Sequence, residues 1–298
     1  MSDTSITATV RSYFQLTKPT IMLLVVFTGV AALVIEGSML SHPFRFILFM
    51  TGLYLTGGSA NALNQYFERE VDARMARTMK RRPLPLNQIS APRALVFSVA
   101  IGIIGVVLFA IVFNWLTAVL SMATILFYSL FYTLYLKPRT AQNIVIGGAA
   151  GAMSPIGAWA AATGSVSTLP LLMFLIVFLW TPPHFWALAL FCKDDYVKTR
   201  LPMMPVVKGD ARTLNQILWY SIVLVLVSIV PLFYGAGVVY FVAALVLGGL
   251  LVEKVLKARQ RRDEGSFRTL FGFSIIYLFA LFAVMVADAL LPWGHLLG

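Results

Sequence analysis

Three residues with oxygen-bearing side chains, Asn64, Glu68 and Asp72, recur at four-residue intervals at the end of a long apolar segment. A helix turns by about 100° per residue, so this spacing places all three on one side, in a stripe about 12 Å long. Mg²⁺ prefers hard oxygen ligands and is commonly held by one or two carboxylates together with substrate phosphates. The stripe therefore predicts a magnesium site. The alternative is a solvated helix end whose carboxylates pair with Arg69, Arg74 or Arg77.

Cations follow the stripe directly, in the segment RMARTMKRRPLP at residues 74–85. Guanidinium groups bind phosphate oxygens through paired hydrogen bonds, so carboxylates beside them suit a diphosphate that is held through a metal. We expect Arg77, Lys80 and Arg81 to contact this ligand, although basic residues also accumulate in the cytoplasmic loops of membrane proteins. Glu70 points about 160° away from Glu68 and Asp72 on the helix, so we expect it to be a solvated charge.

A second acidic group lies in residues 191–210, FCKDDYVKTRLPMMPVVKGD, where Asp194 and Asp195 stand close to Lys198. Two carboxylate groups on the same side of a membrane would suit a clamp in which two metal ions hold one diphosphate. We therefore expect Asp194 and Asp195 to be metal ligands and Lys198 to contact the diphosphate. The alternative is an ordinary polar loop.

The elements that position these groups are membrane helices. Of the 298 residues, 59% are hydrophobic and 12% are charged, which excludes a typical soluble domain. The formal net charge of +11 indicates basic cytoplasmic loops rather than binding to nucleic acid. A single cysteine, Cys192, excludes an intramolecular disulfide. Residues 1–19 lack the features of a secretory signal, so we expect the first apolar segment to be retained as a span.

We expect an all-α bundle, because long apolar runs are typical of membrane helices and not of the alternating strands of a barrel. Nine windows have the required length of roughly 20 residues. They are residues 20–37, 45–67, 94–113, 115–136, 142–162, 169–191, 214–234, 236–253 and 269–291. With these spans, 22 of the 23 Lys and Arg residues fall on one side. The positive-inside rule then predicts a cytoplasmic N-terminus, an external C-terminus and a charged site that faces the cytoplasm.

Two single side chains and one glycine-rich segment inside the apolar windows are further candidates. His184 follows Pro182 and Pro183, and an intramembrane histidine is a functional candidate unless it bonds a carbonyl freed by the prolines. Tyr132 could donate to the bridging oxygen of a diphosphate, or belong to an aromatic belt. Residues 147–161, GGAAGAMSPIGAWAA, lack the features of a phosphate loop. Their small side chains predict close helix packing or room for a bulky flat substrate.

The motifs together resemble a known family. The pattern N-x-x-x-E-x-x-x-D followed by R-T-x-x-x-R-P-L-P resembles the first motif of the UbiA-type intramembrane prenyltransferases. Residues 135–161, 181–191 and 193–209 resemble the branch of this family that farnesylates protoheme IX, and the similarity extends from about residue 12 to about residue 215. The family commonly has a second D-x-x-x-D motif. This chain instead has K-D-D-Y at residues 193–196, as that branch does, which puts a symmetrical second metal site in doubt.

The resemblance implies one prenyltransferase domain over residues 1–298, in the inner membrane of a bacterium and in contact with lipid. It implies Mg²⁺-dependent transfer of the farnesyl group of farnesyl diphosphate to a vinyl group of protoheme IX (heme B), with addition of water. It further implies that Lys137 contacts the diphosphate and that His184 positions the heme. A heme A synthase and oxidase assembly proteins become candidate partners. Two alternatives stay open: an aromatic acceptor such as a quinone precursor, and an anion transporter.

Overall fold

The protein is described by a computed structural model that covers residues 6–291. Within this range every regular element is a helix. The elements are α1 (Ile6–Leu16), α2 (Pro19–Glu36), η1 (Ser38–Ser41), α3 (Pro43–Asp72), α4 (Ala76–Met79), α5 (Ala91–Val112), α6 (Trp115–Leu126), η2 (Phe127–Leu136), α7 (Asn143–Ala152), α8 (Ser154–Thr163), α9 (Thr168–Phe191), α10 (Lys193–Lys198), α11 (Met204–Val207), α12 (Gly209–Ile229), η3 (Val230–Tyr234), α13 (Val238–Arg261) and α14 (Glu264–Leu290).

Nine helical units among residues 6–291 are long and apolar enough to span a membrane. Six are single helices, and three are composite: α6 continues into η2, α7 into α8, and α12 into η3. Each predicted window overlaps one of these units, so the all-α class and the predicted number of spans are confirmed. The outer surface of the bundle carries large apolar side chains, including Ile111, Trp115 and Phe233, as a lipid environment requires. Which end of the bundle faces the cytoplasm stays a prediction.

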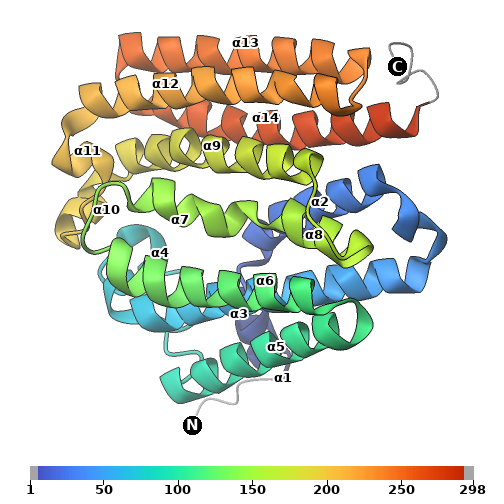
Figure 1. The fold of residues 1–298 in the computed structure, drawn as a ribbon. Coiled ribbons are helices and arrows are strands. Elements are labelled where there is room, and N and C mark those ends of the chain that lie inside the picture. The colour runs from blue at the N-terminus through green and yellow to red at the C-terminus, as the bar shows by residue number, and fades with distance from the viewer. Residues whose placement is uncertain (1–5, 292–298) are drawn as a thin grey trace.

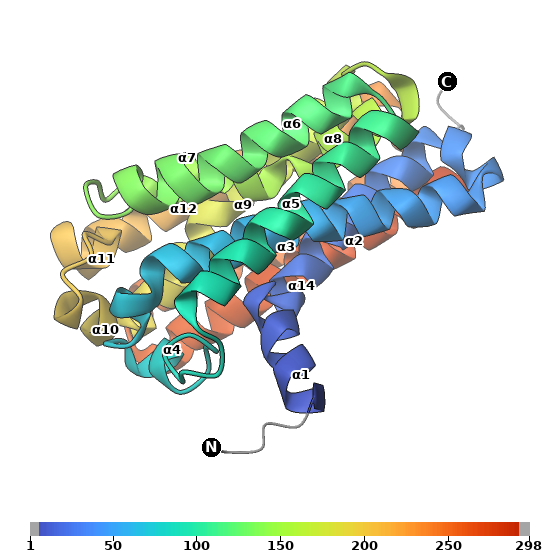
Figure 2. The ribbon, with the colours of Figure 1, turned by 90° about the horizontal axis from the view of Figure 1, so that it is seen from below.

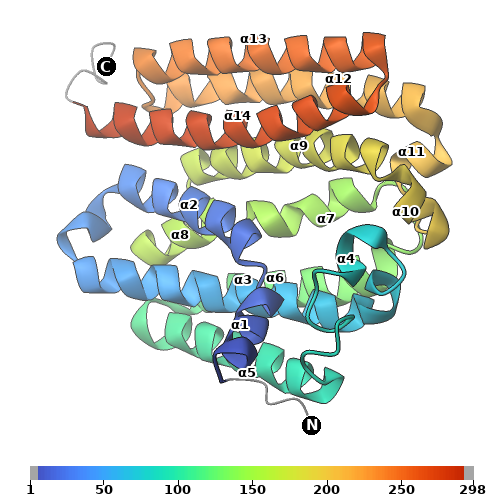
Figure 3. The ribbon, with the colours of Figure 1, turned by 180° about the vertical axis from the view of Figure 1, so that it is seen from behind.

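The spanning helices pack in three groups. Figure 1 shows α12, α13 and α14 on one side of the bundle, α7, α8 and α9 in the middle, and α3, α5 and α6 on the other side. Helix α9 joins the groups, because it contacts α7 and α8 as well as α12 and α14. Helix α2 contacts α8 and α14 and lies on the face of the bundle that Figure 3 shows. The core of the bundle is apolar and includes the fully buried side chains of Trp186, Tyr240 and Tyr277.

The short helices α4, α10 and α11 gather at one end of the bundle (Figures 1 and 2). The end of α3 at Asp72 lies at the same end, because α4 follows it after three residues. We call this region the polar end. Helix α1 differs from the spanning helices in its direction, since Figure 2 shows it running steeply across them. It exposes Ile6, Val10 and Phe14, which are spaced by four residues and form an apolar stripe.

Prolines define several helix ends. Pro19, Pro43 and Pro92 lie in the first turns of α2, α3 and α5. The N–H groups of a first turn have no acceptor within the helix, so proline, which lacks an N–H, loses no hydrogen bond there. Pro155 lies in the first turn of α8 and thus divides the composite span α7–α8 at Met153. The divided span brings two short glycine- and alanine-rich helices into the middle group of the bundle.

The element η2 is a π-helix of ten residues, Phe127–Leu136. Its wider turn is visible at its end, where the Lys137 N–H donates to the Tyr132 carbonyl, five residues earlier, at 2.9 Å. The Thr133 hydroxyl likewise donates to the carbonyl of Tyr128, also five residues earlier, at 2.7 Å. π-Helical turns are rare and occur frequently at functional sites. Here the element leads from the interior of the bundle to the polar end.

Candidate active site

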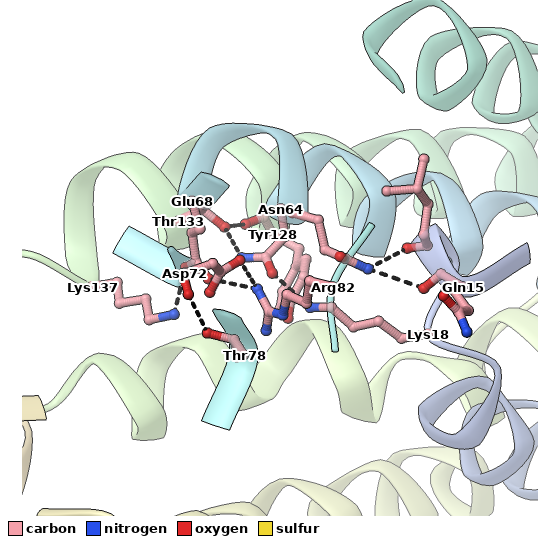
Figure 4. A network of polar contacts seen from close by, with 12 residues as sticks. Gln15, Lys18, Asn64, Glu68, Asp72, Thr78, Arg82, Tyr128, Thr133 and Lys137 are labelled. Atoms are coloured by element: carbon pink, nitrogen blue, oxygen red, sulfur yellow. Dashed lines mark hydrogen bonds and ion pairs between the residues drawn. The ribbon is translucent and has the colours of Figure 1, made fainter. Parts of the chain in front are cut away.

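The stripe of Asn64, Glu68 and Asp72 is buried at the polar end of α3. The three side chains expose 2%, 6% and 2% of their surface. In Figure 4 they lie along the same side of the helix, as the four-residue spacing predicts. Glu70 is exposed on α3, with 77% of its side-chain surface accessible, as predicted. The stripe therefore faces the interior of the protein and is not a solvated helix end.

Each residue of the stripe has its own cation. Lys18 Nζ donates to Asn64 Oδ1 at 2.6 Å, Lys137 Nζ donates to Glu68 Oε1 at 2.5 Å, and the Arg82 guanidinium donates to Asp72 Oδ2. Arg82 Nη1 is also 3.7 Å from Glu68 Oε2, so this cation joins the two carboxylates. The alternative prediction, in which Glu68 and Asp72 pair with Arg69, Arg74 or Arg77, is wrong. The cations come instead from three separate parts of the chain, which converge on α3 (Figure 4).

Lys18 reaches the site from the junction between α1 and α2. Its backbone has φ of 53°, in the left-handed region that non-glycine residues rarely adopt, and such strain is typical of functional positions. Gln65 on α3 holds the end of α1, because its Nε2 donates to the carbonyls of Gln15 and Leu16 at 3.1 and 2.9 Å. Burial, and then the nearby Arg82 guanidinium, lower the pKa of Lys18 well below its usual range. An anionic ligand would thus favour the charged form of Lys18.

The π-helix η2 supplies two contacts from the opposite side. Thr133 Oγ1 accepts a hydrogen bond from Asn64 Nδ2 at 3.0 Å, and Lys137, just after η2, reaches Glu68. Since Asn64 Nδ2 donates to Thr133, its Oδ1 is directed to Lys18 and is the amide atom that offers lone pairs. Tyr132 is buried, and its ring stacks on Tyr128 with 5.2 Å between the ring centroids. Tyr132 thus lies on the element that supplies these two contacts, and its role toward a diphosphate stays a prediction.

The charge and chemistry of this cluster fit an anionic ligand that carries a metal. With all five groups charged, the state that an anionic ligand favours for Lys18, three cations face two carboxylates and the cluster has one positive charge in excess. An amide oxygen and two carboxylates on one stripe are the hard donors that Mg²⁺ prefers. A diphosphate ester carries about three negative charges at neutral pH. Its complex with one Mg²⁺ therefore carries about one negative charge, which balances the cluster.

The second acidic pair has a different environment. Asp195 is buried, and its two carboxylate oxygens accept hydrogen bonds from the backbone N–H groups of Ala76 and Arg77 at 3.0 and 3.1 Å. Asp194 and Lys198 are exposed. Within residues 6–291 no three His, Cys, Asp or Glu side chains cluster, either at this pair or at the stripe. Asp195 thus ties the residue 73–90 loop to α10, and the pair in this arrangement does not fit a second metal.

Among the three cations expected to bind the ligand after the stripe, Arg77 differs from Lys80 and Arg81 in its burial. Arg77 is half-buried, and its Nε is buried without a hydrogen-bond partner within residues 6–291. A buried donor without a partner is costly, so Arg77 is suited to receive an anion. Lys80 and Arg81 are exposed at the polar end. For these two residues the structure shows no contact with the stripe.

His184 lies on α9, in the middle group of helices. Its ring is buried, and Nδ1 lies 2.7 Å from Ser274 Oγ on α14. The alternative in which the ring bonds a carbonyl freed by Pro182 and Pro183 is therefore wrong. The structure does not bring His184 into the ion network of the stripe.

The glycine-rich segment serves close packing at two positions and leaves space at two others. A Cβ added at Gly147 would overlap the Tyr132 ring, and one added at Gly148 would lie 2.9 Å from Thr181. At Gly151 and Gly157 an added Cβ meets no heavy atom of residues 6–291 within 4 Å. The expectation of close helix packing is thus confirmed for Gly147 and Gly148.

Replacing Gly147 by Ala is expected to destabilise the protein by about 1–3 kcal/mol, because overpacking forces the buried Tyr132 ring to move. Gly151→Ala is the matched control, since it adds the same methyl group where space is open. Thermal unfolding of the two variants in detergent measures the difference. Equal midpoints for the two variants would show that the contact between Gly147 and Tyr132 imposes no constraint.

The predicted site residues did not include three residues of the cluster, Lys18, Arg82 and Thr133. Lys18 precedes the first span and Thr133 lies within an apolar span, so neither belongs to a motif that spacing reveals. Arg82 follows the expected Arg81 in an irregular segment, where helical spacing cannot indicate which of two adjacent cations points to the stripe. The quoted motif R-T-x-x-x-R-P-L-P did contain a signal for Arg82, which is its second Arg.

Comparisons with known proteins agree with this architecture. The profile of the UbiA prenyltransferase family matches residues 24–281. A curated relative, the protoheme IX farnesyltransferase of Erythrobacter litoralis, is 47% identical over 293 residues, which are 96% of this chain and 95% of the relative. A structure of digeranylgeranylglyceryl phosphate synthase has a TM-score of 0.78 at 17% identity and covers 94% of this chain and 98% of its own. A UbiA homologue from Archaeoglobus fulgidus, bound to GPP and Mg²⁺, has a TM-score of 0.62 at 16% identity and covers 92% of this chain and 99% of its own.

Proposed function

Because the chain belongs to the UbiA prenyltransferase family, we propose that it transfers the farnesyl group of farnesyl diphosphate to a vinyl group of protoheme IX. One observation carries the choice of acceptor: the relative from Erythrobacter litoralis, 47% identical over nearly its whole length, is named for this reaction. Family membership favours an enzyme over the alternative of an anion transporter. The product would be heme O, formed with addition of water and release of diphosphate.

We place the diphosphate at the polar end, beside Asn64, Glu68 and Asp72. These three residues would hold Mg²⁺, which when bound supplies a Lewis acid that neutralises charge on the diphosphate oxygens. Support for Mg²⁺ comes from the donor set on the stripe and from the Archaeoglobus fulgidus homologue solved with GPP and Mg²⁺. Asp194 and Asp195 are assigned no step, because the exposed Asp194 and the amide-bound Asp195 do not fit a second metal.

The cations of the cluster would act on the leaving group. In the structure Arg82 and Lys137 pair with the two carboxylates and Lys18 donates to Asn64, and on binding of the diphosphate the three cations would redirect their N–H donors to its oxygens. Charge accumulates on these oxygens as the allylic C–O bond breaks, so buried donors stabilise the transition state more than the ground state. Arg77, with its unpaired Nε, would add a further donor. The vinyl group would then capture the allylic cation, and water would add to the carbocation left on the former vinyl carbon and release a proton, which gives the hydroxyethylfarnesyl side chain.

The position of the site in the cell follows from the charge distribution. The polar end carries the basic segments, so we propose that it faces the cytoplasm, with the N-terminus on the same side and the C-terminus outside. We further propose that residues 1–298 form one domain in the inner membrane of a bacterium. A heme A synthase and oxidase assembly proteins, which would use the product, remain proposed partners.

Mass spectrometry of the products tests this function. Purified protein in detergent is incubated with Mg²⁺, farnesyl diphosphate and protoheme IX, and the extracted hemes are analysed. We expect a heme whose mass increases by one farnesyl group and one hydroxyl group, because the added water loses one proton, and the increase requires Mg²⁺. Parallel reactions with a quinone precursor test the alternative acceptor. Prenylation of that acceptor without any farnesylated heme would refute our assignment.

Replacing Lys18 by Met is expected to lower kcat/KM for farnesyl diphosphate by about 10- to 100-fold, the range for loss of one charged hydrogen bond. The reason is that Lys18 would donate directly to the diphosphate, although it lies outside the motif of the stripe. Arg11→Met, on the exposed surface of α1, is the matched control and should retain full activity. Steady-state kinetics with varied farnesyl diphosphate provide the measurement. A Lys18 variant as active as the Arg11 variant would remove Lys18 from the site.

A further inference from the structure

The His184 ring is held between two aromatic rings. The Trp180 ring stacks on it with 4.3 Å between centroids, and the Phe271 ring of α14 stacks with 4.5 Å between centroids. The side chain exposes only 7% of its surface. Because aromatic rings flank His184 in this way, its plane is fixed, and the ring nitrogens at its edge are the atoms through which it can act.

Hydrogen bonds to Ser274 define the tautomer of this ring. The Ser274 hydroxyl donates to the Phe271 carbonyl at 2.6 Å, and the same oxygen lies 2.7 Å from His184 Nδ1. A hydroxyl has one proton and a carbonyl can only accept, so both contacts are satisfied only if His184 Nδ1–H donates to Ser274. Trp180 Nε1 donates to the Ser274 carbonyl at 2.6 Å, which fixes the same residue further. His184 Nε2 is then an unprotonated nitrogen with a free lone pair.

Among residues 6–291 the hydrogen bond of this ring is the one at Nδ1, and Nε2 is not one of the side-chain atoms that are fully buried without a partner. An intramembrane ring nitrogen that keeps some access and carries a free lone pair is a candidate for binding a ligand. A neutral imidazole whose Nδ1–H is held by a hydrogen bond is the form in which histidine ligates metals. His184 also lies seven residues before the end of α9, about 10 Å along the helix from Phe191 and thus deeper than the polar end.

We propose that His184 Nε2 is an axial ligand to the iron of the heme substrate and that Ser274 is the positioning residue that keeps this nitrogen unprotonated. The proposal rests on the proposed function, because it takes the acceptor to be a heme. Among the residues around His184, Trp180 and Phe271 set the plane of the ring and Ser274 sets its proton. The heme would thus be held by its iron, while the diphosphate is held separately by the stripe and its cations.

Spectroscopy of the bound heme tests the ligand directly. The purified full chain is mixed with protoheme IX without farnesyl diphosphate, and the iron–histidine stretching band of the ferrous complex is recorded by resonance Raman. We expect wild-type protein to show this band and His184→Gly to lose it, and added imidazole should restore a nitrogen-ligated spectrum. His42→Gly is the matched control, since His42 lies between η1 and α3, outside the network of His184, and should leave the band unchanged.

The role of Ser274 requires a second pair of variants. Ser274→Ala removes the acceptor for Nδ1–H, so the band should shift to lower frequency and heme affinity should fall by about 10-fold or more. Ser274→Thr keeps a hydroxyl and should restore both. Loss of packing alone would lower stability in the alanine variant without moving the band, and that result would remove Ser274 from its positioning role.

The outcomes separate this inference from the proposed function. A wild-type protein that makes farnesylated heme while His184→Gly keeps the wild-type iron–histidine band would overturn axial ligation and leave the function intact. A wild-type protein that neither binds nor farnesylates heme would overturn both. Loss of the band in His184→Gly, its recovery with imidazole and its shift in Ser274→Ala would together establish the ligand and its positioning residue.

Discussion

Asp72→Asn is expected to lower farnesyl transfer at least about 100-fold, the cost of removing one preorganised charge from a catalytic site. The variant keeps the size of the side chain but removes the negative charge that would hold Mg²⁺ and that orients Arg82 in the structure. Heme extraction and mass spectrometry provide the measurement, in purified protein and in membranes of cells that express the variant. The farnesylated species should disappear, while unmodified protoheme IX remains.

Two controls separate catalysis from folding. Glu70→Gln changes a carboxylate only two residues away on the same helix, but on the exposed side, and should retain full activity. Asp72→Asn leaves a partly buried Arg82 without its partner, and such a charge can destabilise the fold. The double variant Asp72→Asn, Arg82→Gln removes both charges. Recovery of activity in the double variant would contradict a metal-binding role and reduce Asp72 to a partner of Arg82.

Asp195→Ala is expected to have the second largest effect, about 10- to 100-fold on kcat/KM, because Asp195 ties the residue 73–90 loop to α10. Without its carboxylate, the N–H groups of Ala76 and Arg77 lose their acceptors, each at a cost of about 1–3 kcal/mol if they stay buried. The loop carries Arg82 and Thr78, and the Thr78 hydroxyl donates to the carbonyl of Asp72 at 2.8 Å. Release of the loop should therefore weaken the pairing of Arg82 with the stripe.

Asp194→Ala is the matched control, and it distinguishes anchoring of the loop from a second metal site. If Asp195 anchors the loop, Asp194→Ala should be fully active, and Asp195→Asn should recover part of the activity because its amide oxygen still accepts one hydrogen bond. Activity measured over a series of Mg²⁺ concentrations completes the test. If both alanine variants required much more Mg²⁺, the pair would be a metal site and the anchoring role would be wrong.

Hydrophobic length and helical spacing predicted the parts of the structure that depend on local pattern. The windows of apolar residues identified each spanning unit, because a membrane requires a long run of such residues irrespective of the partners of the helix. The interval of four residues correctly placed Asn64, Glu68 and Asp72 on one buried side of α3 and Glu70 on the other. Within a regular helix, spacing alone determines which residues share a side.

The partners of the stripe depended on tertiary structure and could not be read from the sequence. Lys18 and Lys137 lie 46 and 69 residues from the side chains that they contact, and no local rule selects them. Arg82 and Arg81 are adjacent in an irregular segment, so neither composition nor periodicity indicates that only Arg82 reaches the carboxylates. The contacts of Asp195 were missed for a similar reason. Its carboxylate oxygens accept hydrogen bonds from backbone N–H groups, and because almost every residue has such a group, the sequence does not indicate which ones Asp195 binds.

The π-helical segment η2 implies that the length of this span matters as much as the identity of its residues. A single-residue deletion near Tyr128 that the wide turn does not absorb would leave a span of nearly the same hydrophobic length. The remainder of the helix would then rotate by about 100° relative to α3, which would carry Thr133 and Lys137 away from Asn64 and Glu68. Such a deletion would preserve membrane insertion and yet dismantle the ion network, so insertions and deletions here should be selected against as strongly as changes in the charged residues.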